Sequence, residues 1–373
     1  MYGLSVPANG LQNSVYSFRN IYRCYLKCRK NKRNSVNALK FEINAEENIL
    51  KLERELKNKI YRPSRSILFA AKKPKLREIF AADFRDRVVH HILIAQLEKI
   101  WEPIFIHDSY ACRAGKGTHK AITRLRGFLR KITKNGNVRA YYLQLDIKDF
   151  FTSIHKQTLF SIIKKKIKNP DILWLAETII SWDCTCSYIQ KGNIHLIRSI
   201  PYNKSLFGKD NLRGLPIGNL TSQFFANIYL NELDQFVKHT LKAHYYLRYV
   251  DDFVILSRDK EELQRFGAEV EKFVTERLSL RLHPTRRRLL PVSVGIDFLG
   301  YVVRQNYILV RRRVVNNLKD KIRQFTQSKE IDAGAVKAMI ASYFGHFKWA
   351  DSYRLQEKLL RDNPRMPVVA PIR

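Results

Sequence analysis

The chain has 373 residues, of which 45% are hydrophobic and 12% aromatic, so it can bury a sizeable core over two or three lobes and is not globally disordered. Its 68 lysines and arginines outnumber 34 acidic residues, which gives a net charge of +34. Such an excess repels itself in a compact fold unless a polyanion offsets it, and this indicates nucleic acid as the partner. No run of 18 apolar residues and no signal peptide are present, so we expect no membrane association.

The cysteines predict an intracellular protein, because an odd number of them in a large chain is typical of reduced thiols. Their spacings do not match the Cys-x-x-Cys pairs of structural zinc sites, although Cys184 and Cys186 lie near His195. We therefore expect all five side chains to be buried as small hydrophobic groups. They are Cys24, Cys28, Cys112, Cys184 and Cys186.

The first predicted elements are basic and helical. Residues 15–40 carry eight basic and no acidic residues, with aromatic residues interleaved. This stretch is either an arm that faces nucleic acid or a solvated basic helix, and both interpretations stay open. Apolar residues at helical spacing predict a helix over 45–60, which Pro63 ends. A hairpin is predicted over 66–82, with its turn at residues 73–75.

The middle of the chain alternates helices and strands. We predict helices over 84–101 and 118–132, a strand over 139–147, and helices over 157–168, 171–182 and 219–241. Residues 183–213 are irregular and polar, so we expect a loop-rich insertion there.

The last third begins with two apolar runs hinged on two aspartates in residues 244–257 (HYYLRYVDDFVILS), the pattern of a β-hairpin. A helix over 260–278, short strands around 289–310 and helices over 312–360 are predicted to follow. This order of elements predicts an α+β fold, in which a sheet carries helices on one face, rather than a doubly wound parallel sheet.

Asp251 and Asp252 are the first candidates for chemistry. Two adjacent carboxylates inside an apolar hairpin are costly unless positive charge compensates them. A solvated turn explains one aspartate comfortably, but two with such apolar flanks less well. Divalent metal ions remove the cost, because hard cations prefer carboxylate oxygens.

Asp146, at the end of the predicted strand 139–147, supplies a third carboxylate. A strand-end aspartate beside a hairpin-tip pair places three carboxylates at one sheet edge, where two Mg²⁺ ions about 4 Å apart would be held. One ion would lower the pKa of an attacking hydroxyl, and the other would neutralise charge on a leaving pyrophosphate. The three aspartates therefore predict a two-metal catalytic centre.

Four blocks, in this order, resemble the reverse transcriptase family: residues 146–151 (DIKDFF), 214–223 (GLPIGNLTSQ), 249–252 (YVDD) and 298–301 (FLGY). The resemblance implies an RNA-directed DNA polymerase with a right-hand fold, made of fingers, a palm with an antiparallel sheet, and a helical thumb. It also implies three regions: an N-terminal basic extension over 1–62, interleaved fingers and palm over 63–305, and the thumb with a C-terminal tail over 306–373.

The resemblance further assigns roles to single residues. Asp146, Asp251 and Asp252 would be catalytic, and together with Ile147 they would bind two Mg²⁺ ions, for which Mn²⁺ would substitute. Phe151 would be a steric gate, because a flat aromatic ring excludes a ribose 2′-hydroxyl. The incoming dNTP would be bound by Lys75, Arg77, Phe151, Ile217, Gly218 and Gln223, and the primer would be gripped by Phe298, Leu299, Gly300 and Tyr301.

A finer resemblance concerns the diversity-generating retroelement reverse transcriptases, whose copying is mutagenic at template adenines. Most reverse transcriptases carry Gln where Ile217 stands, and Ser-Pro where Ser222 and Gln223 stand. Residues 110–119 (YACRAGKGTH) and 345–351 (GHFKWAD) are also similar to that subfamily. The implied partners are a structured template RNA, a DNA primer extended into cDNA, dNTPs and a small basic accessory protein, in a bacterial or phage-encoded cytoplasmic enzyme.

The region after the catalytic hairpin is basic. Residues 281–323 carry eleven basic and only two acidic residues, a density that predicts contacts to the phosphates of a duplex. Arg286 stands where the family often has a lysine that protonates the leaving pyrophosphate. Arginine is a poor proton donor, so Arg286 would replace that lysine only electrostatically. His283 is a second, weaker candidate for the proton donor. The predicted nucleic-acid-binding residues are Arg113, Lys116, Arg286, Arg287, Arg288, Arg311, Arg312 and Arg313.

Several alternatives remain at this point. Related bacterial enzymes of anti-phage defence share much of the pattern, and the stretch 183–213 is longer than expected for the retroelement subfamily. A non-catalytic RNA-binding scaffold would have no need of the three aspartates. An RNA polymerase is disfavoured by Phe151, and a group II intron maturase by the short chain beyond the predicted thumb.

Overall fold

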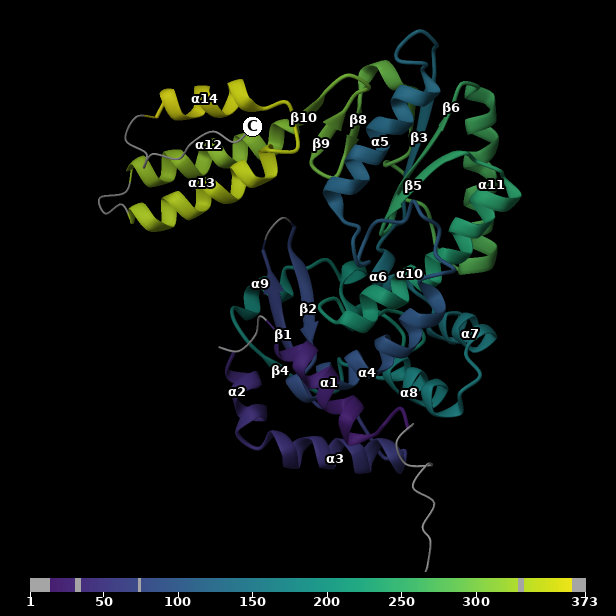
Figure 1. Cartoon of the computed structure of the whole chain (residues 1–373), viewed down its shortest axis with the longest axis vertical. Coiled ribbons are helices and arrows are strands. Elements are labelled where there is room, and N and C mark those ends of the chain that lie inside the picture. The colour runs from purple at the N-terminus through teal and green to yellow at the C-terminus, as the bar shows by residue number, and fades with distance from the viewer. Residues whose placement is uncertain (1–13, 31–34, 73–74, 328–331, 364–373) are drawn as a thin grey trace, which may run out of the picture. The chain divides into compact units, whose positions relative to one another are not determined.

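The computed structural model describes residues 14–30, 35–72, 75–327 and 332–363. The chain divides into two compact units whose segments interleave along the sequence (Figure 1). The first unit comprises residues 1–106, 147–236 and 271–282, and the second comprises 107–146, 237–270 and 283–373. Both helices and strands are present in each unit, as the α+β prediction requires.

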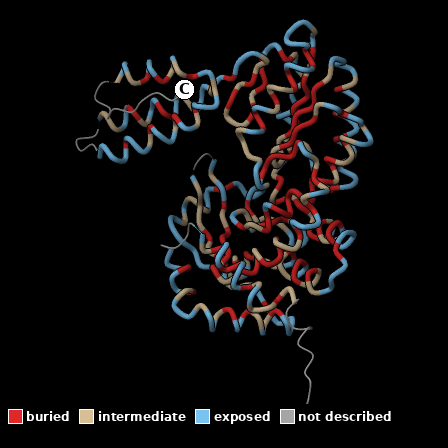
Figure 2. The backbone as a smooth tube through the Cα atoms, viewed as in Figure 1, coloured by how far each residue is buried: buried red, intermediate tan, exposed pale blue. Residues whose placement is uncertain are grey.

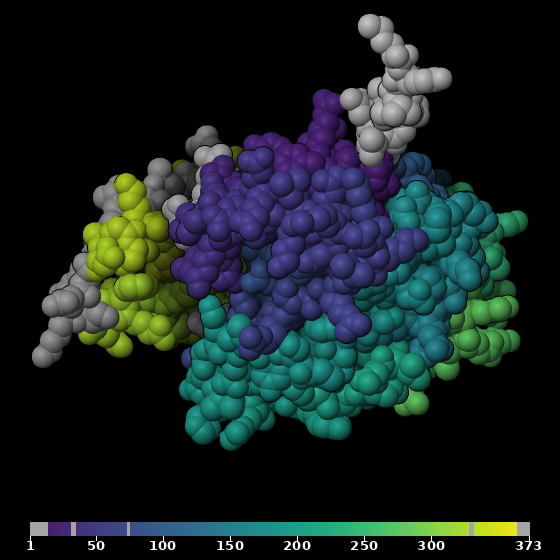
Figure 3. Space-filling view, turned by 90° about the horizontal axis from the view of Figure 1, so that it is seen from below, coloured from purple at the N-terminus to yellow at the C-terminus, as the bar shows by residue number. Residues whose placement is uncertain are grey.

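The first unit is mainly helical. Helix α1 (Phe18–Arg29) packs against α3 (Ala45–Lys57) and α4 (Phe84–Trp101), and its Ile21, Tyr25 and Cys28 are buried. Part of the basic stretch 15–40 is therefore an amphipathic helix held on the unit, followed by α2 (Val36–Ile43). In Figure 3 the residues of α3 form part of the surface of this unit.

A small sheet completes the first unit. Strands β1 (Ser66–Ala71) and β2 (Arg77–Ala81) form the predicted hairpin, with Ile67 opposite Ala81. Of its predicted turn, Lys73 and Pro74 lie outside the described residues. Strand β4 (Tyr188–Gln190) pairs parallel to β1.

The insertion 183–213 also contains the helix α9 (Ile194–Arg198) and two short 3₁₀ turns. The prediction of a loop-rich insertion was therefore wrong for these segments. The insertion is bound to β2 as well, because the Ser205 hydroxyl and the Leu206 N–H donate to the buried Glu78 carboxylate at 2.6 and 2.8 Å.

A four-stranded antiparallel sheet dominates the second unit. Its strand order is β5 (Tyr245–Tyr249), β6 (Asp252–Ser257), β3 (Tyr141–Asp146) and β7 (Arg288–Pro291). Asp252 begins β6 and lies opposite both Tyr249 on β5 and Asp146 on β3. The register therefore brings two of the predicted catalytic aspartates side by side.

Both faces of this sheet are covered. Helix α5 (Thr118–Ile132) packs with Tyr142, Leu247 and Val254 on one face. Leu143 points to the other face, because neighbouring strand residues alternate. Its Cδ2 would lie 3.3 Å from a Cβ at Gly267, so α11 (Lys260–Leu278) covers this face. The expectation of helices on one face only was wrong. Figure 2 shows the central residues of β3, β5 and β6 as buried, whereas β7 has only intermediate and exposed residues.

The C-terminal part of the second unit consists of a second sheet and three helices. The strands β8 (Ile296–Phe298), β9 (Tyr301–Val303) and β10 (Ile308–Val310) form an antiparallel meander. Helices α12 (Arg312–Gln327), α13 (Ala333–Phe347) and α14 (Tyr353–Arg361) share one apolar cluster around Leu318, Ile340 and Phe344. Their assignment as a thumb, and the boundaries at residues 62 and 305, stay predictions.

The remaining helices are α6 (Phe150–Ser153), α7 (Lys156–Lys166), α8 (Pro170–Ser181) and α10 (Leu220–Gln235), the last continued by a π-helical turn over Phe236–Thr240. No described helix is both long enough and apolar enough to cross a membrane. Cys24, Cys28 and Cys184 are buried as expected, but Cys112 and Cys186 are exposed, so the expectation was wrong for these two.

Candidate active site

The turn between β5 and β6 carries the candidate catalytic aspartates. Its two central residues are Val250 and Asp251, and of these only Val250 has a positive φ, of 54°. This is the pattern of a type II′ turn, in which glycine is the usual first residue. A β-branched residue held there stores backbone strain, a feature that concentrates at functional sites.

Asp252 lies in a strongly negative environment. Its Oδ1 accepts a hydrogen bond from Gln144 Nε2 at 3.0 Å. Burial, followed by the nearby charges of Asp146 and Asp251, raises the pKa of Asp252 to about 7, although the bond from Gln144 acts in the opposite direction. The side chains around Asp146, Asp251 and Asp252 therefore do not supply enough positive charge to neutralise the three carboxylates.

The Arg286 guanidinium supplies positive charge at Asp146. It forms an ion pair with the Asp146 carboxylate, and this bond, with the charges of Asp146, Asp251 and Asp252, raises the pKa of Arg286 above its usual value. Arg286 was predicted to contact nucleic acid, and the structure places it against the aspartates.

This arrangement fits divalent cations. Among the described residues, no three Asp, Glu, His or Cys side chains are gathered into a ready-made metal cluster. However, carboxylates on adjacent strands are the ligands that hard cations prefer, and a guanidinium already stabilises one of them. Asp146, Asp251 and Asp252 are thus suited to hold cations when these are present. Ile147, the next residue after Asp146, is buried.

Arg248 anchors the turn between β5 and β6 from inside the sheet. Its side chain is fully buried and donates to the Val250 carbonyl at 3.0 Å and to the Ser109 hydroxyl at 3.1 Å. Its main chain pairs with Asp108 and Tyr110, so residues 108–110 extend the sheet beside β5. Sequence reasoning missed Arg248, although a charged residue inside an apolar strand was a visible signal.

A second carboxylate, Asp297, organises the arginines predicted to bind nucleic acid. Arg311 forms an ion pair with Asp297, and Arg288 Nη1 lies 3.9 Å from its Oδ2. Gln144 Nε2 also donates to the Asp297 carbonyl at 3.2 Å, which links this group to Asp252. Gln144 and Asp297 were not predicted as site residues; a lone amide between Leu143 and Leu145 was the available signal.

The other predicted nucleic-acid contacts in the second unit are separate from this group. Lys116 donates to the His107 carbonyl at 2.7 Å, and Arg113 donates to the Ser109 carbonyl at 3.1 Å. The side chains of Arg287, Arg312 and Arg313 are exposed. All these residues therefore present positive charge on the second unit, and their contact with nucleic acid stays a prediction.

The predicted primer grip is the turn between β8 and β9. Leu299 and Gly300 both have positive φ, 51° and 92°, as a type I′ turn requires. Phe298 and Tyr301 are fully buried, so only the turn itself is accessible. The Tyr301 ring stacks on His346 of α13 with centroids 4.3 Å apart, and its hydroxyl donates to the His346 carbonyl at 2.8 Å.

The predicted dNTP-binding residues all belong to the first unit. The Ile217 carbonyl accepts a hydrogen bond from Phe80 N–H at 3.0 Å, which fixes the loop 214–219 on β2. Gly218 has φ of 119°, and a Cβ there would lie 2.8 Å from Ile79 Cγ2, so only glycine fits. The Phe151 carbonyl accepts from Leu215 N–H at 2.8 Å, which joins α6 to the same loop.

Lys75, Arg77 and Gln223 are exposed side chains of the same unit. Arg77 begins β2, the strand that carries Phe80, and Gln223 lies in the first turn of α10, which follows the loop 214–219. Residues from the hairpin, α6, the loop 214–219 and α10 are thus gathered near β2 although they are far apart in the sequence. Their contact with a nucleotide stays a prediction.

Replacing Arg286 with Ala is expected to leave the aspartates without their neighbouring cation. The free energy of unfolding without metal should fall by about 1 kcal/mol, a small effect because the pair is partly solvated. Added Mn²⁺ should then raise the melting temperature more in Arg286→Ala than in wild type. Thermal melting with EDTA and with Mn²⁺ measures both, and Arg313→Ala is the control. An equal Mn²⁺ shift in wild type and Arg286→Ala would contradict this role for Arg286.

Comparison with known proteins gives consistent matches. A family model described as reverse transcriptase (RNA-dependent DNA polymerase) matches residues 70–303. Protein YkfC of Escherichia coli (strain K12) is 24% identical over 301 residues, which cover 71% of this chain and 74% of that protein. Group II intron-encoded protein LtrA of Lactococcus lactis subsp. cremoris is 24% identical over 379 residues, and the match covers 80% of this chain but only 59% of LtrA.

A solved structure of apo telomerase from Candida tropicalis, truncated from its C-terminal domain, is similar with a TM-score of 0.48 and 12% identity. The match covers 66% of this chain and 55% of the telomerase chain.

Proposed function

This chain belongs to the reverse transcriptase (RNA-dependent DNA polymerase) family, and we propose that it copies an RNA template into cDNA by extending a DNA primer with dNTPs. The observation that carries the proposal is the pairing of Asp146 with Asp252 across adjacent strands, beside Asp251 in a strained turn. A protein that only binds RNA has no use for negative charge in this position, because carboxylates repel phosphates.

We assign the three aspartates to two divalent cations, Mg²⁺ or Mn²⁺, with the Ile147 carbonyl as a further ligand. When bound, these cations would lower the pKa of the primer 3′-hydroxyl and neutralise the leaving pyrophosphate. The chain itself positions the carboxylates: Gln144 orients Asp252, and Arg248 holds the Val250 carbonyl of the turn. Arg286 balances the charge of Asp146 in the absence of cations.

We assign the incoming dNTP to the first unit. Arg77 and Lys75 would hold the triphosphate, for which a forked guanidinium is well suited. Gly218 would let the backbone approach the nascent base pair, and Gln223 and Ile217 would flank it. Phe151, partly exposed on α6, would lie against the sugar.

Replacing Phe151 with Val is expected to admit ribonucleotides. The smaller side chain leaves room for a 2′-hydroxyl, so the ratio of rNTP to dNTP incorporation should rise by about tenfold or more. Single-nucleotide extension with each nucleotide measures kcat/KM. Phe266→Val, a partly buried phenylalanine of α11, is the control. Unchanged discrimination in a folded Phe151→Val variant would remove the steric-gate assignment.

We further propose the diversity-generating retroelement subtype, with a structured template RNA and a small basic accessory protein in a bacterial or phage-infected cytoplasm. Ile217 supports this subtype. It replaces an amide that would hydrogen-bond near the nascent pair, and an apolar group there relaxes base discrimination.

The test is primer extension on an RNA template with dNTPs and Mg²⁺, followed by sequencing of the product. Wild type should extend the primer, and Asp251→Asn should not. Errors should concentrate opposite template adenines, and Ile217→Gln should reduce them. No extension by wild type, even with structured RNA and accessory protein, would favour the RNA-binding scaffold instead.

If the errors showed no preference for template adenines, the second candidate would be favoured, a reverse transcriptase of anti-phage defence. The observation behind this candidate is the insertion 183–213, whose β4 extends the sheet of β1 and β2 and whose Ser205 is bound to Glu78. An error spectrum without adenine preference, equal in wild type and Ile217→Gln, would select it.

A further inference from the structure

The second unit contains a cavity of about 390 Å³ that the proposed function does not use. It lies at the end of β3 away from Asp146, where Tyr141 pairs with Pro291, a residue of its wall. At about 3.3 Å per strand residue, the cavity is roughly 17 Å from the catalytic aspartates. Its volume is within the range of ligand-binding pockets, roughly 300–1,000 Å³.

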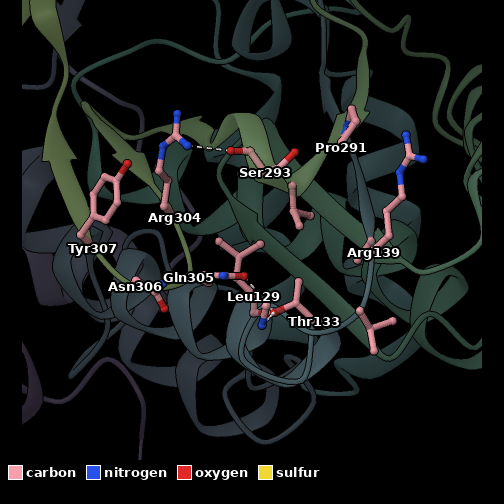
Figure 4. Close-up of a pocket in the computed structure, with 13 residues that line it drawn as sticks. Leu129, Thr133, Arg139, Pro291, Ser293, Arg304, Gln305, Asn306 and Tyr307 are labelled. Atoms are coloured by element: carbon pink, nitrogen blue, oxygen red, sulfur yellow. Dashed lines mark hydrogen bonds between the residues drawn. The ribbon is translucent and has the colours of Figure 1, made fainter.

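One side of the cavity is formed by Arg304 and Tyr307. Arg304 donates to the Ser293 and Val294 carbonyls at 2.7 and 3.0 Å, and its guanidinium lies 5.7 Å from the centre of the Tyr307 ring. The buried Arg304 Nε has no partner within the described residues. Figure 4 shows Arg304 and Tyr307 on one side of the cavity and Arg139 on the other. Planar groups of this kind stack on nucleobases.

The floor combines apolar and amide groups. Leu129 and Pro291 are apolar, whereas Gln305 and Asn306 carry amides that donate and accept hydrogen bonds. The Gln305 amide lies against the Thr133 hydroxyl, with 3.1 Å between Gln305 Oε1 and Thr133 Oγ1, and this contact holds the side chain at the cavity. A Cβ at position 136 would lie only 2.5 Å from Gln305 Nε2 and would displace this amide, so Gly136 makes room for it. Fixed amides can pair with the polar edge of a base.

The surroundings are positively charged. From Asp108 to Asp146 the chain carries nine lysines and arginines and no acidic residue between them. Four exposed basic residues lie next to the cavity: Arg130 and Lys131 in the last turn of α5, and Lys134 and Arg139 in the segment that joins α5 to β3. Charge of this sign attracts the phosphates of a strand whose base enters the cavity.

We propose that this cavity binds an unstacked nucleobase of single-stranded RNA and so anchors the RNA away from the catalytic aspartates. The inference rests on the proposed function only in taking RNA as the partner. The Arg304–Tyr307 pair provides the stacking surface, Gln305 and Asn306 contact the base edge, and Arg139 contacts the phosphate. Single-stranded segments are where proteins reach RNA base edges, because the major groove of an A-form helix is too narrow.

Cross-linking tests the site directly. A short random RNA that contains 4-thiouridine is irradiated with wild type, and the adducts are mapped by mass spectrometry. We expect adducts at Tyr307 and its neighbours in addition to those elsewhere. Adducts confined to other segments would overturn the proposal, whether or not the enzyme extends primers.

Binding and extension then separate the cavity from the catalytic function. The double variant Asn306→Ala, Tyr307→Ala should bind the same RNA about tenfold more weakly, the effect of one lost base stack. Tyr202→Ala and Lys165→Ala, exposed in the first unit, are the controls. Extension of an oligo(dT) primer on poly(rA) at saturating template should be equal in all folded variants, because the aspartates at the other end of β3 are unchanged. Equal affinity in wild type and double variant, or displacement by DNA of the same sequence as readily as by RNA, would overturn the proposal.

Discussion

The Asp252→Asn variant is expected to lose primer extension and to gain stability. Loss of one cation ligand should lower kcat by about a thousandfold, because metal coordination stabilises the transition state by several kcal/mol. The shape of the side chain is kept, and Gln144 Nε2 can donate to the new amide oxygen as it does to the carboxylate. The change is therefore confined to charge.

The gain in stability depends on pH. The pKa of Asp252 is raised to about 7 by burial and by Asp146 and Asp251. Between about pH 4 and pH 7 the carboxyl is therefore protonated in the folded chain and ionised in the unfolded chain, so wild-type stability falls as pH rises through this window. At pH 8 the variant should be more stable by about 4 kcal/mol, and below about pH 4 the difference should vanish.

Denaturant unfolding in EDTA at both pH values measures this difference. Asp320→Asn, an exposed aspartate of α12, should change neither activity nor the pH dependence. A variant that is active, or that is destabilised at pH 8, would contradict the role of Asp252 as a charged ligand in a carboxylate cluster.

The Arg248→Met variant is expected to be the most destabilised of the single substitutions. It leaves the Val250 carbonyl and the Ser109 hydroxyl without their buried donor, and each lost bond to a charged group costs about 1.5–3 kcal/mol. We expect the free energy of unfolding to fall by about 3 kcal/mol or more. Activity should fall as well, even at temperatures where the variant is folded, because the turn that carries Asp251 loses its anchor.

Two further variants make this result specific. Arg248→Lys keeps the charge but not the forked geometry, so it should recover little of the loss. Arg277→Met, at an exposed position of α11, should be neutral. If Arg248→Lys restored full stability and activity, charge alone would matter, and the two directed hydrogen bonds would not.

Local sequence signals predicted the fold well where they were strong. The helices 84–101, 118–132 and 260–278 are found at the predicted bounds, and the hairpin at Asp251 and Asp252 is present. Capping explains the first of these, because the Asp83 side chain accepts from Arg85 N–H at the start of α4. The reverse transcriptase family, the enzyme class and the fold class are confirmed by the family match over residues 70–303.

Long-range pairing explains the errors. Strand β4 has exposed, irregular residues and exists only because it pairs with Ser66–Leu68, far away in the sequence. The second covered face of the sheet follows from packing of Leu143 on α11, although the nearly continuous apolar run of β3 was a signal for it. Gln144 and Arg248 stand out locally as polar residues inside apolar strands, but their partners Asp252 and Ser109 are more than 100 residues away, so the local pattern does not reveal what they bind.

The stack of Tyr301 on His346 joins the β8–β9 turn to helix α13. Gly300 lies at this contact: its φ of 92° is one that residues with a side chain rarely adopt, and a Cβ there would be in van der Waals contact with the His346 ring at 3.4 Å. A rotation of α13 would therefore displace the turn through this contact. With the turn as primer grip and α13 in the thumb, the width of the bound duplex would set the position of the primer end. The enzyme would then sense the helical form of its product mechanically, without contacting a single base.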